Sequence, residues 1–343
     1  MEAVRTLDAL DRQLDHLRLS VTDRCNLRCQ YCMPEEEYNW LAPPDILSFD
    51  EYRRLVEVFV SLGVDKVRLT GGEPLLRPDL PAAVAMIAAV SGVRDLALTT
   101  NGVLLRKHAG ALKAAGLHRL TVSLDTLDPA RFSKLSRRSN HAAVLDGIAA
   151  AAEEGFRGTK IDTVVIRGTN EDELSPLIEY GKTAGAQVRF IEYMDVGGAT
   201  NWREGLVFSR AEMLAELTRI YGPITEVEKA DTAPADQYVL PDGTVFGIIS
   251  ATTQPFCASC GRSRVTADGM WYRCLYAVAG TDLRAPLRAG ASPSELADLI
   301  TGIWNRRRDQ GAVDRSTVER RSTFVTIGSL RSDPHLEMHT RGG

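Results

Sequence analysis

Short apolar segments alternate with amphipathic helical segments from about residue 16 to residue 194, and this alternation most constrains the fold. Successive β-then-α units require a parallel sheet with right-handed crossovers, which is either barrel-like or doubly wound. The six candidate strands are HLRLSVTD, KVRLTG, DLALTTNG, RLTVSLD, TKIDTVVIRG and QVRFIEYM. Helical patterns separate them at about 49–61, 78–90, 104–115, 140–155 and 171–184. The sequence therefore predicts an α/β domain.

The candidate strands carry polar residues at alternate positions, whereas strands buried on both faces of a parallel sheet are nearly all apolar. Because the apolar face must pack on the helices, we expect the polar face to point into a wet, functional lumen. The residues placed on this face are Arg18, Ser20, Thr22, Lys66, Arg68, Thr70, Thr121, Ser123, Asp125, Lys160 and Asp162, with Arg189 opposite Val188 and Phe190. The cations among them suit an anionic ligand. A half-exposed sheet with solvated charges is the alternative.

The overall composition is ordinary for a soluble globular protein. The net charge is −4, which gives no indication of nucleic-acid or membrane binding. The opening MEAVRTLDALDRQ has no signal-peptide pattern, and no stretch approaches the roughly 18 apolar residues of a membrane span. We therefore expect a cytoplasmic protein with reduced thiols. Its six cysteines fall into two groups of three, which predicts two metal sites.

The first group, Cys25, Cys29 and Cys32, follows the first candidate strand. Three thiolates within eight residues can hold three irons of a [4Fe–4S] cluster, whose usual complement is four cysteines. One iron would stay open to bind a cofactor or substrate. The alternative is a zinc knuckle, but structural zinc is four-coordinate and no other Cys or His lies close by in the sequence.

This CxxxCxxC spacing, with Tyr31 just before the third cysteine, resembles the signature of the radical S-adenosylmethionine (SAM) superfamily. The resemblance extends to Gly71-Gly72-Glu73-Pro74, which ends the second candidate strand as the family's GGEP motif does. It implies that the cluster binds SAM and cleaves it reductively. The GGEP segment would meet the amino group of the SAM methionine, and glycine suits such close backbone approach.

The pattern changes after residue 195. A helix is expected at about 209–220, a hairpin over QYVLPDGTVFGIIS, and a further helix at about 293–307. The second group, Cys257, Cys260 and Cys274, predicts a second open-iron cluster, with a zinc site borrowing a remote ligand as the alternative. We divide the chain into a partial barrel over 1–200, a C-terminal module over 201–330, and a flexible, irregular tail over 331–343 that ends in Gly342-Gly343.

Taken together, these segments resemble the GTP 3′,8-cyclase family of radical-SAM enzymes. The matching segments include LRLSVTDRCNLRCQYCMP, RLTGGEPLLR, LTTNG, VSLDT, RFIEYMDVG, CASCGRSRVTADGMWYRCL and the closing GG. The resemblance implies an incomplete (βα)₆ TIM-like barrel, closed on one side by a C-terminal module that binds the second cluster. It also implies a homodimer, GTP as substrate, an electron donor, and a next pathway enzyme that receives the product.

Residue roles follow from the same resemblance. Arg189 would be an active-site arginine. The expected SAM contacts are Tyr31, Gly72, Ser123 and Met194. The expected GTP contacts are Arg18, Arg68, Thr99, Lys160, Arg262, Ser263 and Arg264. In the family tail an apolar residue precedes the two glycines, but here Arg341 does. Arg341 or a nearby polar group could reach the active site if the tail enters it.

The implied reaction begins with reductive cleavage of SAM. The resulting 5′-deoxyadenosyl radical takes hydrogen from C3′ of GTP, and C3′ then bonds to guanine C8, the first step of molybdenum cofactor biosynthesis. The second cluster would anchor the guanine. Two alternatives remain: a radical-SAM enzyme that modifies peptides, and a non-enzymatic zinc module that binds proteins or nucleic acids. The absence of a basic stripe in the sequence disfavours the module.

Overall fold

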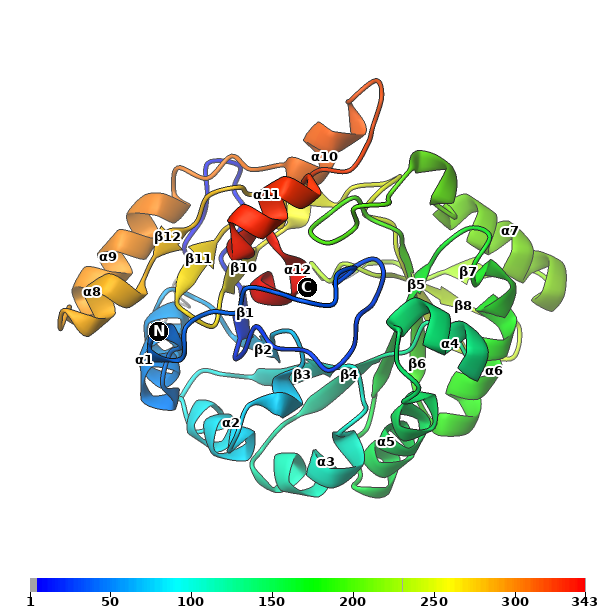
Figure 1. Ribbon diagram of the computed structural model, residues 1–343, viewed down its shortest axis with the longest axis horizontal. Coiled ribbons are helices and arrows are strands. Elements are labelled where there is room, and N and C mark those ends of the chain that lie inside the picture. Colours follow the sequence, from blue (N-terminus) through cyan, green and yellow to red (C-terminus); the bar gives the residue numbers. More distant parts are fainter. Residues whose placement is uncertain (1–4, 230, 343) are drawn as a thin grey trace.

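The computed structural model describes residues 5–229 and 231–342, which form one curved sheet with helices on its outside (Figure 1). The six predicted strands are present and lie side by side in sequence order. They are β1 (His16–Ser20), β2 (Lys66–Thr70), β3 (Asp95–Thr100), β4 (Arg119–Ser123), β5 (Lys160–Val165) and β6 (Gln187–Glu192). All five pairings between them are parallel. In a doubly wound sheet the strand order reverses at one point, whereas here each strand pairs with the next one in the sequence. The sheet is therefore barrel-like, and the doubly wound alternative is wrong.

The helices that connect these strands pack on the apolar face of the sheet. They are α1 (Phe49–Ser61), α2 (Leu80–Ala88), α3 (Leu105–Ala114), α4 (Pro129–Ser136), α5 (His141–Glu153) and α6 (Leu174–Ala184). Leu17, Leu19 and Val67 are fully buried in the core that this packing creates. The solvated-sheet alternative is therefore wrong. Helix α4 was not predicted, although Asp128-Pro129 gives a start signal: the Asp128 carboxylate accepts hydrogen bonds from the backbone of Ala130 and Arg131.

Strands of the C-terminal module extend both edges of the partial barrel. They are β7 (Thr225–Glu226), β8 (Asp236–Val239), β9 (Val245–Ile249), β10 (Arg262–Val265), β11 (Met270–Tyr272) and β12 (Thr281–Asp282). Strand β9 pairs in parallel with β6, and β10 pairs in parallel with β1. The predicted hairpin over 237–250 is confirmed as the antiparallel pair β8 and β9. The barrel is incomplete, because β12 and β7 end the strand order.

Capping boxes begin α1, α7 (Arg210–Tyr221) and α9 (Pro293–Trp304). In each, the N-cap serine accepts a backbone hydrogen bond from a glutamate three residues later, and that glutamate caps the serine in return. Helix α8 (Arg284–Arg288) lies between β12 and α9. Single 3₁₀ turns occur at Pro43–Asp45, Pro74–Leu76, Glu171–Glu173, Glu204–Leu206, Cys257–Ser259 and Pro334–Leu336.

The prediction of an irregular tail over 331–343 is wrong for its described residues. Three short helices follow α9, namely α10 (Gly311–Ser316), α11 (Ile327–Ser332) and α12 (Met338–Arg341). Figure 1 shows α12 inside the curve of the strands. Thr340 and Arg341 are at most 3% exposed. Gly343, part of the predicted Gly-Gly ending, lies outside the described residues. Among the residues described, no helix has the length and apolar composition needed to cross a bilayer.

Candidate active site

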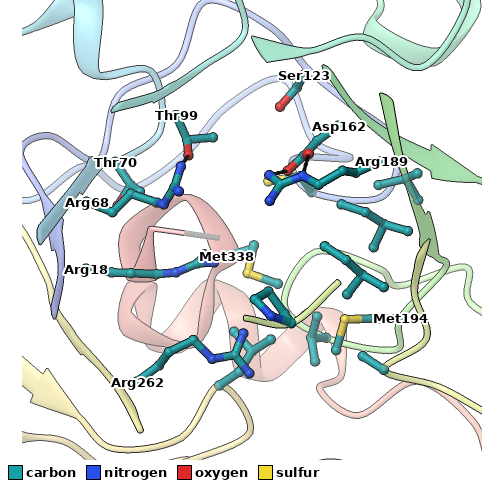
Figure 2. Close-up of a pocket in the computed structure, with 18 of the residues that line it drawn as sticks. Arg18, Arg68, Thr70, Thr99, Ser123, Asp162, Arg189, Met194, Arg262 and Met338 are labelled. Carbon is teal, nitrogen blue, oxygen red and sulfur yellow. Dashed lines mark hydrogen bonds and ion pairs between the residues drawn. The ribbon is translucent and has the colours of Figure 1, made fainter. Parts of the chain in front are cut away.

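One cavity of about 490 Å³ lies within the curve of the sheet. All residues with a predicted site role line it except Ser263. Figure 2 shows Arg18, Arg68 and Arg262 extending into it from one side, with Arg189 facing them from the other. The polar strand faces therefore point inward as expected. Ser263 lies between Arg262 and Arg264 on β10, and strand alternation turns its fully buried side chain away from the cavity.

The first cysteine group lies in the loop after β1, and all three side chains line the cavity. A local turn brings them together, because the backbone amides of Cys32 and Met33 both donate to the Cys29 carbonyl, at 3.0 and 2.7 Å. Burial raises the pKa of the Cys25 thiol to about 11, and burial, Asp125 and the neighbouring thiols raise that of Cys29. Repulsion from the neighbouring thiolates thus adds to the effect of burial on Cys29. In the described part of the chain, no three His, Cys, Asp or Glu side chains converge on a single-ion site.

The GGEP segment packs directly on the start of this loop. The Gly72 amide donates to the Thr22 carbonyl at 2.9 Å, and the Glu73 amide donates to the Arg24 carbonyl at 2.7 Å. A Cβ on Gly71 or Gly72 would lie only 2.4 or 2.3 Å from those same carbonyl oxygens. Glycine is therefore required at both positions for the two loops to approach.

Glu73 stands behind this wall and is absent from the cavity lining. Its fully buried carboxylate accepts hydrogen bonds from Thr100 Oγ1 and from the Asn101 amide, both at 2.7 Å. Burial raises the pKa of Glu73 to about 7, although these hydrogen bonds oppose the rise. The glutamate ties the loop after β2 to the loop after β3.

Tyr31 is fixed by a carboxylate at the end of β4. Its hydroxyl donates to Asp125 Oδ2 at 2.6 Å, and Asp125 Oδ1 accepts from the Val164 amide at 2.9 Å. Burial raises the pKa of Asp125 to about 6. Ser123 lies two residues before Asp125, and Met194 follows β6; both line the cavity. Asp125 had been placed on the polar face, but no ligand role was predicted for it.

The wall formed by β10, β1 and β2 is strongly cationic. Burial, and then the charges of Arg264, Arg262 and Arg68, lower the pKa of Arg18. Burial lowers the pKa of Arg68 to about 10, with Arg189 as the next contributor. Arg68 Nη1 donates to both Thr99 Oγ1 and Thr121 Oγ1 at 3.0 Å, and neither acceptor carries a charge. These cations repel one another, so the wall favours an anion.

The opposite wall holds Arg189 in an ion pair. Its Nε and Nη2 donate to the two carboxylate oxygens of Asp162 at 2.7 and 2.8 Å, a two-point contact that fixes the guanidinium plane. Lys160 lies two residues before Asp162 on β5. Burial lowers the pKa of Lys160 to about 8, and the charges of Arg189, Arg119 and Arg68 add to this shift.

The second cysteine group lines the same cavity from the C-terminal module. Arg262 Nη2 and Nε lie 3.3 and 3.4 Å from the Cys260 sulfur, to which they donate. Burial opposes ionisation of Cys260, but Arg262 outweighs it and lowers the pKa of this thiol to about 6. Arg262 also stacks over Phe256, with 4.7 Å between its guanidinium carbon and the ring centroid. This site therefore supplies a thiolate next to a cation.

The tail contributes cavity residues that the sequence did not identify. Met338 and His339 line the cavity. Arg341 does not reach it, so the prediction that this side chain could enter the site is wrong. Its Nη1 donates to the Leu275 carbonyl at 3.1 Å, its Nε donates to the His335 carbonyl, and its guanidinium stacks over Tyr272. Arg341 anchors the tail to the C-terminal module.

Comparison with known proteins agrees with this geometry. Residues 19–181 match the family model of the radical SAM superfamily, and residues 186–313 match Molybdenum Cofactor Synthesis C. The chain is 57% identical to GTP 3′,8-cyclase 1 of Mycobacterium tuberculosis strain H37Rv, across 99% of this chain and 96% of that protein. It is 43% identical to GTP 3′,8-cyclase of Streptomyces coelicolor, across 94% and 96%.

Among solved structures, the chain is similar to SuiB of Streptococcus suis bound to S-adenosylmethionine. The TM-score is 0.63 at 13% identity, and the match covers 88% of this chain and 68% of that one. At this identity the likeness shows the fold alone. It confirms the partial barrel and leaves the choice of substrate to the closer relatives.

Proposed function

This chain belongs to the GTP 3′,8-cyclase family of radical SAM enzymes, and we propose from that premise that the cavity within the curve of the sheet binds SAM and GTP together. The reaction joins C3′ of the GTP ribose to C8 of the guanine, the first step of molybdenum cofactor biosynthesis. The observation that carries this proposal is the shared lining: both cysteine groups and the inward cations border the same space. An enzyme needs this arrangement to hold two reactants in register.

The residues present fit a cluster and SAM at the N-terminal side. Cys25, Cys29 and Cys32 would hold three irons of a [4Fe–4S] cluster and leave the fourth iron for SAM. Gly72 lets the backbone approach the methionine end, and Tyr31, Ser123 and Met194 line the adjoining wall. When bound, the cluster and SAM would supply the 5′-deoxyadenosyl radical that takes hydrogen from C3′ of GTP. The protein contributes orientation and exclusion of water.

The cationic walls would hold the triphosphate. Arg18, Arg68 and Lys160 all have pKa values lowered by burial and by neighbouring cations, so a polyanion relieves their repulsion when it binds. Guanidinium groups give short charge-assisted bonds to phosphate oxygens. Arg262, Arg264 and Thr99 complete the proposed set. For Ser263, only the backbone remains available, because its side chain faces away from the cavity.

At the C-terminal side, Cys257, Cys260 and Cys274 would hold a second [4Fe–4S] cluster, whose open iron would anchor the guanine. Arg189 would contact the reacting part of GTP, with its plane fixed by Asp162. Helix α12 places Met338 and His339 against the same space and so excludes water from it.

The remaining assignments concern the enzyme in its cell. We propose a homodimer that takes electrons from a cytoplasmic donor and passes its product to the next enzyme of molybdenum cofactor biosynthesis. Cytoplasmic location follows from the reduced thiols that two iron–sulfur clusters need.

The test is anaerobic incubation of the reconstituted protein with SAM, dithionite and GTP, followed by mass analysis. We expect a cyclised guanine nucleotide. With GTP deuterated at C3′, the 5′-deoxyadenosine should gain deuterium, whereas GTP deuterated at C5′ should transfer none. ATP in place of GTP is the substrate control. Transfer from C5′, or equal product from ATP, would contradict the proposed placement of GTP.

A further inference from the structure

Two buried arginines from opposite ends of the chain hold the backbone of the second cysteine group. Arg12 Nη1 donates to the Cys257 carbonyl at 2.9 Å, and Arg307 Nη1 donates to the Cys260 carbonyl at 2.8 Å. Arg12 belongs to the N-terminal segment before β1, whereas Arg307 follows α9. Neither residue lines the cavity, so both act on the cysteine loop from behind.

Asp8 joins the two guanidinium groups. Its Oδ2 accepts from Arg12 Nε at 2.7 Å and from Arg307 Nη1 at 3.0 Å. All three side chains are at most 2% exposed. Burial opposes ionisation of Asp8, yet its bonds to Arg12 and Leu10 outweigh burial and lower its pKa. Two buried cations thus share one buried carboxylate.

One positive charge therefore remains without a fully buried partner. The Asp309 carboxylate lies 3.8 Å from Arg307 Nε, but it is partly exposed and too far for a hydrogen bond. Arg12 Nη2 and Arg307 Nε are buried and make no hydrogen bond within the described residues. A buried charge of this kind is costly unless something negative lies nearby. A cluster held by three thiolates is an anion and meets that need.

We propose that Asp8, Arg12 and Arg307 form a positioning clamp, which fixes the Cys257–Cys260 loop and makes the C-terminal cluster easier to reduce. The proposal rests on the proposed function only in assuming that the second cysteine group binds a cluster. Its physical basis is that buried charge and hydrogen bonding near a cluster set its reduction potential. Packing keeps the clamp rigid: Arg307 stacks over Trp304 at 4.5 Å, and Trp304 Nε1 donates to the Arg12 carbonyl.

The test uses the full chain with Cys25, Cys29 and Cys32 replaced by alanine, so that only the C-terminal cluster forms. Iron content and the midpoint potential from an EPR-monitored titration are measured after anaerobic reconstitution. Arg307→Gln removes a buried cation and should shift the potential to more negative values. Asp8→Asn removes the carboxylate and should shift it to more positive values. Arg306→Gln, at an exposed neighbouring arginine, is the matched control and should leave it unchanged.

Opposite shifts from the two clamp variants are the decisive result, because general loosening of the fold would move both in one direction. Wild-type potentials in both, or shifts of the same sign, would overturn the clamp. Where Arg307→Gln does not fold, Arg12→Gln takes its place with the same expected sign. If the chain that lacks Cys25, Cys29 and Cys32 but keeps the clamp binds no iron, then the second cysteine group does not hold a cluster. This result would contradict the proposed function, and it is distinct from a result that contradicts the clamp alone.

Discussion

Arg264 Nη1 donates a hydrogen bond of 2.8 Å to the backbone carbonyl of Gly342, which fixes the end of the chain beside the cavity. Gly342 has a φ of +66°, and a Cβ there would lie 2.0 Å from Thr70 Oγ1. The tail therefore approaches Thr70 on β2 this closely only because residue 342 has no side chain. Burial lowers the pKa of Arg264 to about 10, with Arg262 as the next contributor, so a carbonyl acceptor also helps to stabilise this cation.

Gly342→Ala should reduce cyclised product by about a hundredfold, because the tail and Arg264 are both displaced from the site. Iron content and the melting temperature should stay close to the wild type, since the cysteine loops do not depend on Gly342. Product is measured by mass analysis and iron by a colorimetric assay. Gly290→Ala is the matched control, because Gly290 also has positive φ (+88°) but no atom within 4 Å of an added Cβ. Equal losses of product in both variants would mean that backbone strain causes the loss, and not the close contact of residue 342 with Thr70.

Arg18→Gln should separate stability from function. Arg18 is buried among Arg264, Arg262 and Arg68, which lower its pKa, so removing its charge relieves repulsion in the ligand-free protein. We expect the melting temperature without GTP to rise by about 2 °C. GTP affinity should fall by about tenfold, because a charged hydrogen bond to phosphate is lost.

The measurements are thermal unfolding without GTP and titration calorimetry with GTP. The exposed Arg94 supplies the control variant Arg94→Gln, which should change neither. A lower melting temperature in Arg18→Gln would mean that Arg18 stabilises the empty cavity, contrary to the cationic-wall argument.

Lys160 should make GTP binding depend on pH. Its pKa is lowered from 10.5 to about 8, and a polyphosphate favours the charged amine. Binding should therefore take up protons near pH 8, and affinity should fall as the pH rises through that value. Between about pH 8 and 10.5, the unfolded chain binds a proton that the folded chain lacks, so the free energy of unfolding should rise across this window.

Calorimetry in two buffers of different ionisation enthalpy measures the proton uptake. Lys160→Met should abolish it, whereas Lys107→Met, at an exposed lysine on α3, should not. Undiminished uptake in Lys160→Met would assign the proton to another group.

The two cysteine groups should differ in their effect on SAM cleavage. Cys29→Ser should abolish the formation of 5′-deoxyadenosine, because the N-terminal cluster then lacks a ligand. Cys260→Ser should lose about half the iron yet still form some 5′-deoxyadenosine without cyclised product. Both 5′-deoxyadenosine and the cyclised nucleotide are measured by chromatography after reaction with dithionite. Complete loss of SAM cleavage in folded Cys260→Ser protein would contradict separate roles for the two groups.

Much of the barrel could be predicted from the sequence, because it depends on local periodicity. Alternation along each strand placed Arg18, Arg68 and Lys160 inside, since the apolar residues between them had to pack on helices. The same rule, applied to Arg262-Ser263-Arg264, would have excluded Ser263 as a side-chain ligand. Helix α4 could also have been predicted from Asp128-Pro129.

Other features have no local signal. Helix α12 has four residues, too few to form by propensity, and contacts such as Arg341 with Leu275 hold it in place. The ion pair of Asp8 with Arg307 joins residues 299 positions apart. Long-range tertiary contacts of this kind appear only in three dimensions. The division of the chain at residues 200 and 330 also has no sharp local signal in the sequence, and it remains a prediction.

His339 should support cyclisation through its ring and not through its charge. The imidazole packs edge-on against Tyr38 and Trp40, with ring centroids 5.0 and 5.8 Å apart, and these residues follow the N-terminal cysteine loop. Burial, with a smaller contribution from Arg28, lowers the pKa of His339 to about 3, so the ring is neutral in any ordinary assay. His339→Phe keeps the aromatic contacts and should retain most activity. His339→Ala removes them and should lower cyclised product by about tenfold, because the tail is no longer held against the loop.

Product yield and the ratio of product to 5′-deoxyadenosine are measured for both His339 variants, with His108→Ala on α3 as a control outside the cavity. If His339→Phe is as defective as His339→Ala, then the imidazole nitrogens contribute directly, and Nδ1, which is buried without a hydrogen bond within the described residues, is the atom to test next.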